Sequence, residues 1–369
     1  MQENGKIAPR QFMILVILFT IGSSILLLPK FIAAEAKQDA WMTAMILAGV
    51  GLLLAWLYNT LSSLFPNMTL VEYSQEILGK WMGKITSFLF FTYTFLLCAM
   101  LLRQISNFFT STIMPETPIE SIHILFLSIV IMGVRYGLEN MARTSEIFFP
   151  WVFILFLLIV LFLTPHVEFQ KIQPVLAKGA NPILHAAFML MGFPFLELVL
   201  FLMILPYVNQ IKEAGRSFLA GTLIGGIVIV SITLLAVLVL GAEETANEHF
   251  PSYTLAQKID IANFIQRVEA IMAGLWIITI FFKLQICYYV SALVLAQTLE
   301  MHDYRPLTLP MAVILVVLAL VIAPDMSYFI NFVATIWTPY SLVFGLFMPL
   351  FLLVIAKIKQ KLLKNERSQ

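Results

Sequence analysis

The chain has 369 residues, of which 60% are hydrophobic and 12% are charged, and its mean hydropathy is +0.93. Apolar runs long enough to cross a bilayer recur along it, so the composition predicts one all-α, integral membrane domain over residues 1–369. The formal net charge of +1 argues against a nucleic-acid partner. Cys98 and Cys287 both lie inside apolar runs, which argues against a disulfide framework or a zinc site. We expect neither a metal nor a cofactor.

Hydropathy predicts about ten membrane spans. Their expected limits are residues 11–36, 41–64, 84–110, 118–136, 147–164, 183–206, 216–240, 264–299, 307–323 and 331–356. An even number of spans places both termini on the same side of the membrane, and the positive-inside rule assigns that side to the cytoplasm. Most Lys and Arg then lie in the cytoplasm, including a basic tail at 357–369, and those expected on the opposite side are Lys37, Lys171, Lys178 and Lys258.

A proline-containing linker at residues 165–182 divides the spans into two halves. The first half covers residues 11–164 and the second covers residues 183–356. An odd number of spans in each half makes the second half cross the membrane with the opposite topology. The pattern therefore predicts a five-plus-five inverted repeat.

Two amphipathic connectors are expected to lie along the membrane surface. The first covers residues 69–80, with Thr69 as the N-cap of a short helix and Glu72 in its first turn. The second covers residues 246–262, on the side opposite the termini.

The first span is interrupted by Thr20-Ile21-Gly22-Ser23-Ser24. A helix that stops near Thr20 and restarts near Ser24 directs free amide groups into the protein, where they attract an anion such as a carboxylate. Gly22 permits close approach to the backbone, and the hydroxyls of Ser23 and Ser24 add donors. The structural alternative is that these small residues only allow close helix packing.

The sixth span is interrupted by Met191-Gly192-Phe193-Pro194. Pro194 lacks an N–H group and frees the carbonyl of Leu190, so carbonyls at Leu190, Met191 and Gly192 are candidates to accept an ammonium group. A proline kink without a ligand role is the alternative. Paired interruptions in corresponding halves indicate a transporter-like site at the bilayer midplane, with the two broken spans as in LeuT-like proteins.

Three ionisable residues lie inside spans, where a charge is costly and indicates function by default: Arg103, Glu197 and Lys283. Lys283 is predicted to project toward the first break, at the place that sodium takes in ion-coupled relatives. Glu197 is a candidate to exchange a proton. The alternative for both is a mutual ion pair that holds the bundle in one state. Arg103, with the neighbouring Gln104, is expected to snorkel to the interface.

The sequence contains no Ser/His/Asp arrangement, HExxH motif, phosphate-binding loop or pair of catalytic carboxylates. We therefore do not expect an enzyme.

Six short motifs, in order along nearly the whole chain, resemble the permease-like B subunits of bacterial spore nutrient germinant receptors. They are Gly22-Ser23-Ser24-Ile25-Leu26-Leu27-Leu28-Pro29, Leu78-Gly79-Lys80-Trp81, Ala142-Arg143-Thr144-Ser145-Glu146-Ile147, Glu197-Leu198-Val199-Leu200, Phe250-Pro251-Ser252-Tyr253 and Ile265-Gln266-Arg267-Val268-Glu269. The resemblance implies a ten-span fold similar to the amino acid-polyamine-organocation (APC) transporters. It also implies a place in the spore inner membrane beside separate A and C subunits.

Three functional hypotheses follow from the breaks and the resemblance. In the first, a nutrient such as an amino acid binds between spans one and six, with Leu97 and Leu101 of span three in the wall, and triggers germination through partner subunits. In the second, the same site serves an autonomous proton-coupled amino acid transporter of the APC superfamily. In the third, the chain is a structural subunit with a vestigial site.

Overall fold

The computed structural model describes residues 5–259 and 268–366. The α-helices are α1 Pro9–Ile21, α2 Ser24–Ala36, α3 Ala40–Leu64, α4 Leu70–Leu78, α5 Lys80–Phe108, α6 Ile119–Arg135, α7 Leu138–Leu163, α8 Asn181–Leu190, α9 Ile211–Val239, α10 Ala242–Asn247, α11 Pro251–Gln257, α12 Glu269–Thr298, α13 Arg305–Val321, α14 Met326–Phe332, α15 Thr338–Leu342 and α16 Met348–Glu366. The 3₁₀ segments are η1 Lys37–Asp39, η3 Thr164–His166, η4 Phe169–Ile172, η5 Leu196–Met203 and η6 Leu205–Tyr207. The π-helical segments are η2 Phe109–Ile113, η7 Val333–Trp337 and η8 Val343–Phe347.

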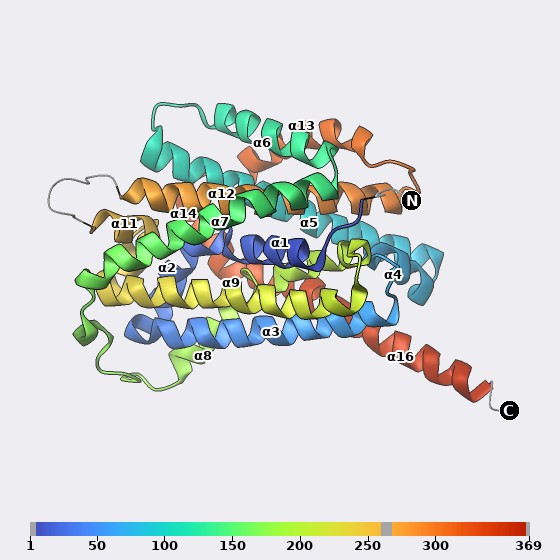
Figure 1. Ribbon diagram of the computed structural model, residues 1–369, viewed down its shortest axis with the longest axis horizontal. Helices are drawn as coiled ribbons and strands as arrows, with labels where there is room; N and C mark the ends of the chain where they lie inside the picture. The colour runs from blue at the N-terminus through green and yellow to red at the C-terminus, as the bar shows by residue number, and fades with distance from the viewer. Residues whose placement is uncertain (1–4, 260–267, 367–369) are drawn as a thin grey trace.

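The long helices lie side by side along the longest axis of the molecule (Figure 1). Six stretches of the described residues are long and apolar enough to cross a membrane, which confirms the predicted all-α membrane fold. The segment before α1, helix α4 and the end of α16 lie at one end of the bundle (Figure 1), which we call the terminal end. Helix α11 lies at the other end, which we call the distal end.

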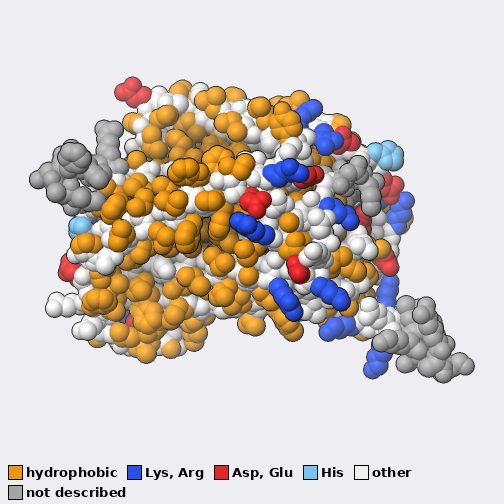
Figure 2. Space-filling model, viewed as in Figure 1, with side chains coloured by type: hydrophobic (Ala, Val, Ile, Leu, Met, Phe, Trp, Pro, Cys, Tyr) orange, Lys and Arg blue, Asp and Glu red, His pale blue; other side chains and the backbone are white. Residues whose placement is uncertain are grey.

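Lys and Arg side chains gather in the half of the visible face nearer the terminal end, whereas hydrophobic side chains cover most of the other half (Figure 2). A bias of this kind is typical of the cytoplasmic side of a membrane protein. The distribution agrees with the cytoplasmic placement of both termini, which stays a prediction.

The first span is broken where the sequence predicts a break. Helix α1 ends at Ile21 and helix α2 begins at Ser24, with Gly22 and Ser23 between them. Apart from residues near its start, α1 is buried, and the helix is apolar around its whole circumference, as a helix inside a bundle must be. Both ends of the break therefore lie in the protein interior.

Helix α1 packs against α7, α9 and α12. Its contact with α9 depends on small residues, because a Cβ atom added at Gly225 would lie 2.7 Å from Cβ of Thr20. The side chain of Thr20 thus faces α9, and its hydroxyl donates to the carbonyl of Val16 at 2.8 Å.

The sixth span is also broken at the predicted place, but it does not resume as an α-helix. Helix α8 ends at Leu190, and after a turn the chain continues as the 3₁₀ segments η5 and η6. Pro194 and Pro206 each remove a backbone donor, and their rings clash with a regular helical turn. A tighter 3₁₀ path accommodates the interruption and carries Glu197 into the interior.

Two other predicted spans differ in detail from the structure. The fifth begins at Leu138 rather than residue 147, because its first turns are polar and fall outside a hydropathy window. The tenth is not a uniform helix, since the π-helical segments η7 and η8 end two residues before Pro339 and Pro349. A widened turn avoids the clash between each proline ring and the preceding turn.

The first predicted connector contains a short helix, α4, as expected. Thr69 is its N-cap and accepts from the Glu72 amide at 3.4 Å, while the Glu72 carboxylate accepts from the Thr69 amide at 2.8 Å. The Thr69 hydroxyl also contacts the side chain of Gln297, near the end of α12, at 2.7 Å. The capping box therefore fixes the start of α4, and the contact with Gln297 ties it to the end of α12.

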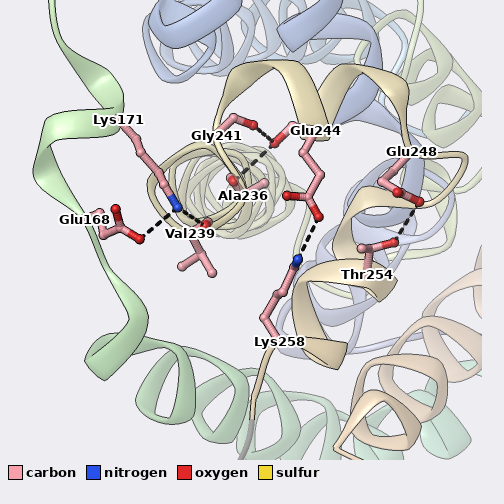
Figure 3. Close-up of polar contacts among 10 residues, drawn as sticks. Glu168, Lys171, Ala236, Val239, Gly241, Glu244, Glu248, Thr254 and Lys258 are labelled. Atoms are coloured by element: carbon pink, nitrogen blue, oxygen red, sulfur yellow. Dashed lines mark hydrogen bonds and ion pairs between the residues drawn. The ribbon is translucent and has the colours of Figure 1, made fainter.

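The second predicted connector, residues 246–262, is divided into two short helices, α10 and α11, and its residues 260–262 lie outside the described part of the chain. Figure 3 shows the polar contacts around these helices. Lys258 pairs with Glu244 at 2.9 Å. Lys171, from the linker between the two halves, pairs with Glu168 at 3.0 Å and donates to the carbonyl of Val239 at 2.5 Å (Figure 3). The linker is thus tied to the end of α9, directly before α10, and α10 is tied to the end of α11.

Helix α11 also reaches the first broken span. The hydroxyl of Ser252 donates to the carbonyl of Ile25 at 2.5 Å, and Lys30 donates to the carbonyl of Glu248 at 2.7 Å. Both contacts attach the α10–α11 pair to α2, the half of the first span that begins at the break.

Candidate ligand site between the two broken spans

A buried ion pair connects α12 to the second broken span. The ammonium of Lys283 lies 2.6 Å from Oε2 of Glu197, and neither side chain is exposed. Lys283 also donates to the hydroxyl of Ser23 at 2.6 Å. One ammonium group therefore contacts both breaks. The predicted contact of Lys283 with the first break and the alternative, an ion pair with Glu197, are both present.

The position of Lys283 depends on the absence of a side chain at residue 22. A Cβ atom added at Gly22 would lie 2.7 Å from Cδ and 2.9 Å from Cβ of Lys283. The ammonium also lies 4.9 Å from the ring centroid of Phe19 and 5.3 Å from that of Phe193. These aromatic faces, one on each broken span, add a favourable cation–π interaction to the charge pair.

The second carboxylate oxygen of Glu197 is held by the last span. The indole Nε1 of Trp337 donates to Oε1 of Glu197 at 2.9 Å. Trp337 belongs to the π-helical segment η7, and its ring is stacked on that of Tyr93 with centroids 5.7 Å apart. Glu197 is thus fixed by one ionic and one neutral donor, as a buried carboxylate requires.

The polar groups of the first break are partly paired. Nε2 of Gln104 donates to the carbonyl of Ser23 at 3.0 Å. The hydroxyl of Ser24 is buried and has no hydrogen-bond partner among the described residues. Because Ser24 begins α2, the first amides of that helix also lack intrahelical partners. The break therefore retains donor capacity that suits an anionic group.

A small cavity lies beside this polar group. Its volume is about 20 Å³, and its wall is formed by Leu97, Met100, Leu101, Gln104, Phe193, Glu197, Phe329, Val333 and Trp337. A volume of this size holds about one water molecule. Entry of a larger ligand therefore requires the wall side chains to move. Among the described residues, no group of three or more His, Cys, Asp or Glu could hold a metal ion.

The candidate residues named from the sequence fall into distinct places. Leu97, Leu101, Phe193 and Glu197 line the cavity. Gly22 and Ser23 contact Lys283, and Ser24 begins α2. Thr20 faces α9 rather than the cavity.

The remaining candidates lie at the second break, where the protein itself satisfies several backbone groups. The carbonyls of Leu190 and Met191 accept from the amides of Phe193 at 3.0 Å and Leu196 at 3.2 Å. The Gly192 amide donates to the hydroxyl of Thr338 at 3.3 Å. Glu197 is consequently the acceptor at this break that faces the cavity.

Sequence reasoning missed the contribution of the last span. Phe329, Val333 and Trp337 supply one side of the cavity wall. Their spacing of four residues, with an indole at residue 337 near the start of the tenth expected span, was a signal for one helical face with a polar tip. The sequence does not show that this face meets Glu197, so the spacing alone could not assign it to the site.

The structure also differs from the expectation that Arg103 and Gln104 snorkel. Their exposed fractions are 6% and 2%. Nη2 of Arg103 donates to the carbonyl of Pro324 at 3.0 Å, in the connector between α13 and α14. Gln104 donates to the carbonyl of Ser23 instead, so both side chains bond inside the protein rather than at the interface.

The long apolar helices around two broken spans define a LeuT-like membrane fold. MhsT in complex with L-phenylalanine is similar, with a TM-score of 0.66 and 13% identity, covering 95% of this chain and 99% of MhsT. Mhp1, a nucleobase-cation-symport-1 family transporter, gives a TM-score of 0.60 at 12% identity, covering 90% of this chain and 76% of Mhp1.

The family follows from the sequence comparison. The family model described as "Spore germination protein" matches residues 6–327, and the chain belongs to this family of spore permease-like proteins. Spore germination protein KB of Bacillus subtilis (strain 168) is 29% identical over 371 residues, covering 100% of this chain and 98% of the relative. Spore germination protein YndE of the same organism is 26% identical over 365 residues, with 97% and 98% covered.

Proposed function

We propose that this chain recognises a nutrient germinant of the amino-acid type as the permease-like subunit of a spore germination receptor in the spore inner membrane. The observation that carries the proposal is the contact of Lys283 with Ser23 and Glu197. Any change in the distance between the two breaks must lengthen or break one of these two contacts. A ligand entering the cavity beside Glu197 therefore acts on the contact that holds the two spans together.

Lys283 acts in this proposal as a built-in cation. Its ammonium supplies the positive charge between Ser23 of the first break and Glu197 of the second, as a bound sodium ion would in an ion-coupled relative. A fixed charge on α12 makes a dissociable cation unnecessary. Ligand binding is then independent of sodium.

The output passes through other chains. The described residues form membrane spans and short connectors, and none of these is a signalling domain. Family resemblance supports A and C subunits as the partners. A conformational change at the breaks would reach the distal surface through the contact of Ser252 with the carbonyl of Ile25.

An amino acid transporter of the APC superfamily, coupled to protons through Glu197, is the second candidate because the fold is that of transporters. Transport requires the terminal end to open. In the described state, the Ile7 amide donates to the carbonyl of Tyr207 at 2.9 Å and the Asn209 amide donates to that of Ile7 at 3.0 Å. These bonds join the segment before α1 to the end of η6 and the residues after it, and a transporter has to break them to open this end.

Two measurements on the purified full chain test the proposal. Thermal unfolding in detergent micelles is recorded with a panel of amino acids and sugars, and a ligand at about a hundred times its Kd should stabilise the chain by about 2.7 kcal/mol. Uptake of the same labelled ligand into proteoliposomes should stay at the level of empty vesicles. Absence of stabilisation by every nutrient contradicts the sensing role, and uptake above that level favours the transporter.

A further inference from the structure

A groove lies between the end of α3 and the start of α9, near the terminal end of the bundle. The two helices pack side by side (Figure 1). The groove has a volume of about 320 Å³, and its wall is formed by Asn59, Ser62, Ser63, Leu205, Ile211, Lys212 and Gly215. This wall and that of the cavity at the two breaks have no described residue in common. The groove is therefore separate from the candidate ligand site.

The α3 side of the groove carries a buried hydroxyl. Ser62 is 7% exposed, and no described residue forms a hydrogen bond with its hydroxyl. The other polar groups of this side are engaged, because the hydroxyl of Ser63 donates to the carbonyl of Thr60 at 2.8 Å and Nδ2 of Asn59 donates to the carbonyl of Gly215 at 2.9 Å. A buried hydroxyl needs a hydrogen-bond partner, and a molecule in the groove can supply it.

The opposite side of the groove is the N-terminus of α9. No side chain caps this helix. The amides of Glu213 and Ala214 donate to the carbonyl of Gln210 at 3.0 and 2.9 Å, but the amides of Ile211 and Lys212 have no carbonyl one turn earlier in the helix. Free amides at the start of a helix of 29 residues favour an anion.

The wall of the groove carries a positive charge. Lys212 is its charged member, is exposed, and forms no ion pair with a described residue. Arg216, one turn further along α9, is also exposed, whereas Glu213 of the first turn is not part of the wall. A hydroxyl, free amides and an ammonium thus surround one space. This set of donors suits a phosphate group, whose oxygens accept several hydrogen bonds at once.

The surface beside the groove favours a lipid as the source of the phosphate. Trp56 is exposed and lies about two turns before Ser63, on the same face of α3. Leu223 is exposed and lies about three turns after Lys212, close to the same face of α9. Both apolar side chains lie farther from the terminal end than the groove does. An exposed Trp beside a cationic site is typical of the membrane interface.

We propose that this groove binds the phosphate group of an anionic phospholipid in the membrane leaflet at the terminal end. The phosphate accepts from the hydroxyl of Ser62 and from the first amides of α9, and it pairs with Lys212. The acyl chains lie along the apolar surface that includes Trp56. Leu205 of η6 is also in the wall, so the lipid contacts the continuation of the second broken span.

A lipid titration of the purified full chain tests this site. Thermal unfolding in a neutral detergent is recorded with phosphatidylglycerol, with phosphatidylcholine of the same acyl chains, and with inorganic phosphate. Phosphatidylglycerol should bind at least about tenfold more tightly than phosphatidylcholine, because the choline group places a further positive charge near Lys212. Inorganic phosphate lacks acyl chains and should stabilise the chain less than phosphatidylglycerol does at the same concentration.

Two substitutions in the groove should weaken the binding of phosphatidylglycerol. Ser62→Ala removes the hydroxyl, and Lys212→Met removes the ammonium. Each should raise the Kd by about tenfold, as expected for the loss of one hydrogen bond to a charged group. The matched controls are Ser128→Ala, where the exposed hydroxyl bonds within α6 to the carbonyl of Leu125, and Lys357→Met, at an exposed lysine of α16. Both controls should keep the affinity of the parent.

Three results would overturn the inference. Equal affinity of the parent for the two phospholipids, or a loss in Lys357→Met as large as in Lys212→Met, would show a general attraction of basic residues to lipid. Stabilisation by inorganic phosphate equal to that by phosphatidylglycerol would identify a free anion rather than a lipid as the ligand. If Lys212→Met does not fold, Ser62→Ala still decides the question, because unchanged affinity in that variant contradicts the site.

Discussion

The ammonium of Lys283 on α12 lies 2.6 Å from Oε2 of Glu197 in η5, with both side chains fully buried. The same ammonium donates to Ser23 at the break in the first span. A buried charge pair of this kind adds little net stability over apolar residues, but loss of one partner leaves an uncompensated charge. The pair therefore stabilises one arrangement of the two broken spans.

Loss of both charges should cost less than the two single losses added together. Lys283→Met and Glu197→Gln should each lower the free energy of unfolding by about 3–5 kcal/mol, whereas the double variant should lose less than the sum of the two. Thermal unfolding of the purified variants measures the difference, with Lys80→Met as a control at an exposed lysine. Strictly additive losses would show that the two side chains do not act as a pair.

Sodium should not affect the ligand response. Lys283 already places a positive charge at Ser23 and Glu197, so replacing sodium with potassium or choline should leave ligand-induced stabilisation of the parent unchanged. The measurement is a ligand titration in each salt at equal ionic strength. A strict requirement for sodium would refute the role of Lys283 as a built-in cation.

Loss of the α4 cap should weaken the terminal end without changing the ligand site. Thr69→Ala removes the acceptor for the Glu72 amide and the contact with Gln297, and should cost about 1 kcal/mol. Thr86→Ala is the matched control, because the Thr86 hydroxyl is exposed and bonds only within its own helix, to the carbonyl of Met82. Equal unfolding temperatures of the two variants would contradict a capping role.

The connector between α12 and α13 should make a small, pH-dependent contribution to stability. Hydrogen bonds from Lys80, at 2.9 Å, and Lys84, at 3.0 Å, hold the pKa of the Glu300 carboxyl below its usual range. A carboxyl whose pKa is lower in the folded state than in the unfolded state stabilises the fold at pH values above its unfolded pKa. This stabilisation is lost as the pH falls through the folded pKa.

The unfolding temperatures of the parent and Glu300→Gln should therefore differ more at about pH 7 than at about pH 3. High salt should reduce the difference, because these groups are exposed. Glu243→Gln, which removes an exposed carboxylate from α10, is the control. A difference that grows toward low pH would have the wrong sign for this interaction.

The breaks and the first cap were predictable because their chemistry is local. Gly22 with two following serines, and Gly192 with Pro194, lower the helix propensity of their own segments. Thr69 and Glu72 form a capping box from their spacing alone. These features need no knowledge of which helices become neighbours.

The rest of the site depends on contacts between distant segments. Trp337 reaches Glu197 because the π-helical segment before Pro339 sets the direction of its side chain. Arg103 is buried and bonds to Pro324 in the connector between α13 and α14. Hydropathy assigns both residues to spans but gives no information on what packs against them.

The most direct test of the central claim is the nutrient response of spores in which Gly22 is replaced by Leu. Any side chain at this position collides with Lys283, because a Cβ atom added at residue 22 would lie 2.9 Å from Cβ of Lys283. Gly274→Leu is the matched control on α12, where an added Cβ meets nothing within 4 Å. Protein in the spore membrane is quantified for each variant.

With equal amounts of protein in the membrane, we expect spores carrying Gly22→Leu to lose the nutrient response and spores carrying Gly274→Leu to retain it. Normal germination with Gly22→Leu would contradict a ligand site between the two broken spans.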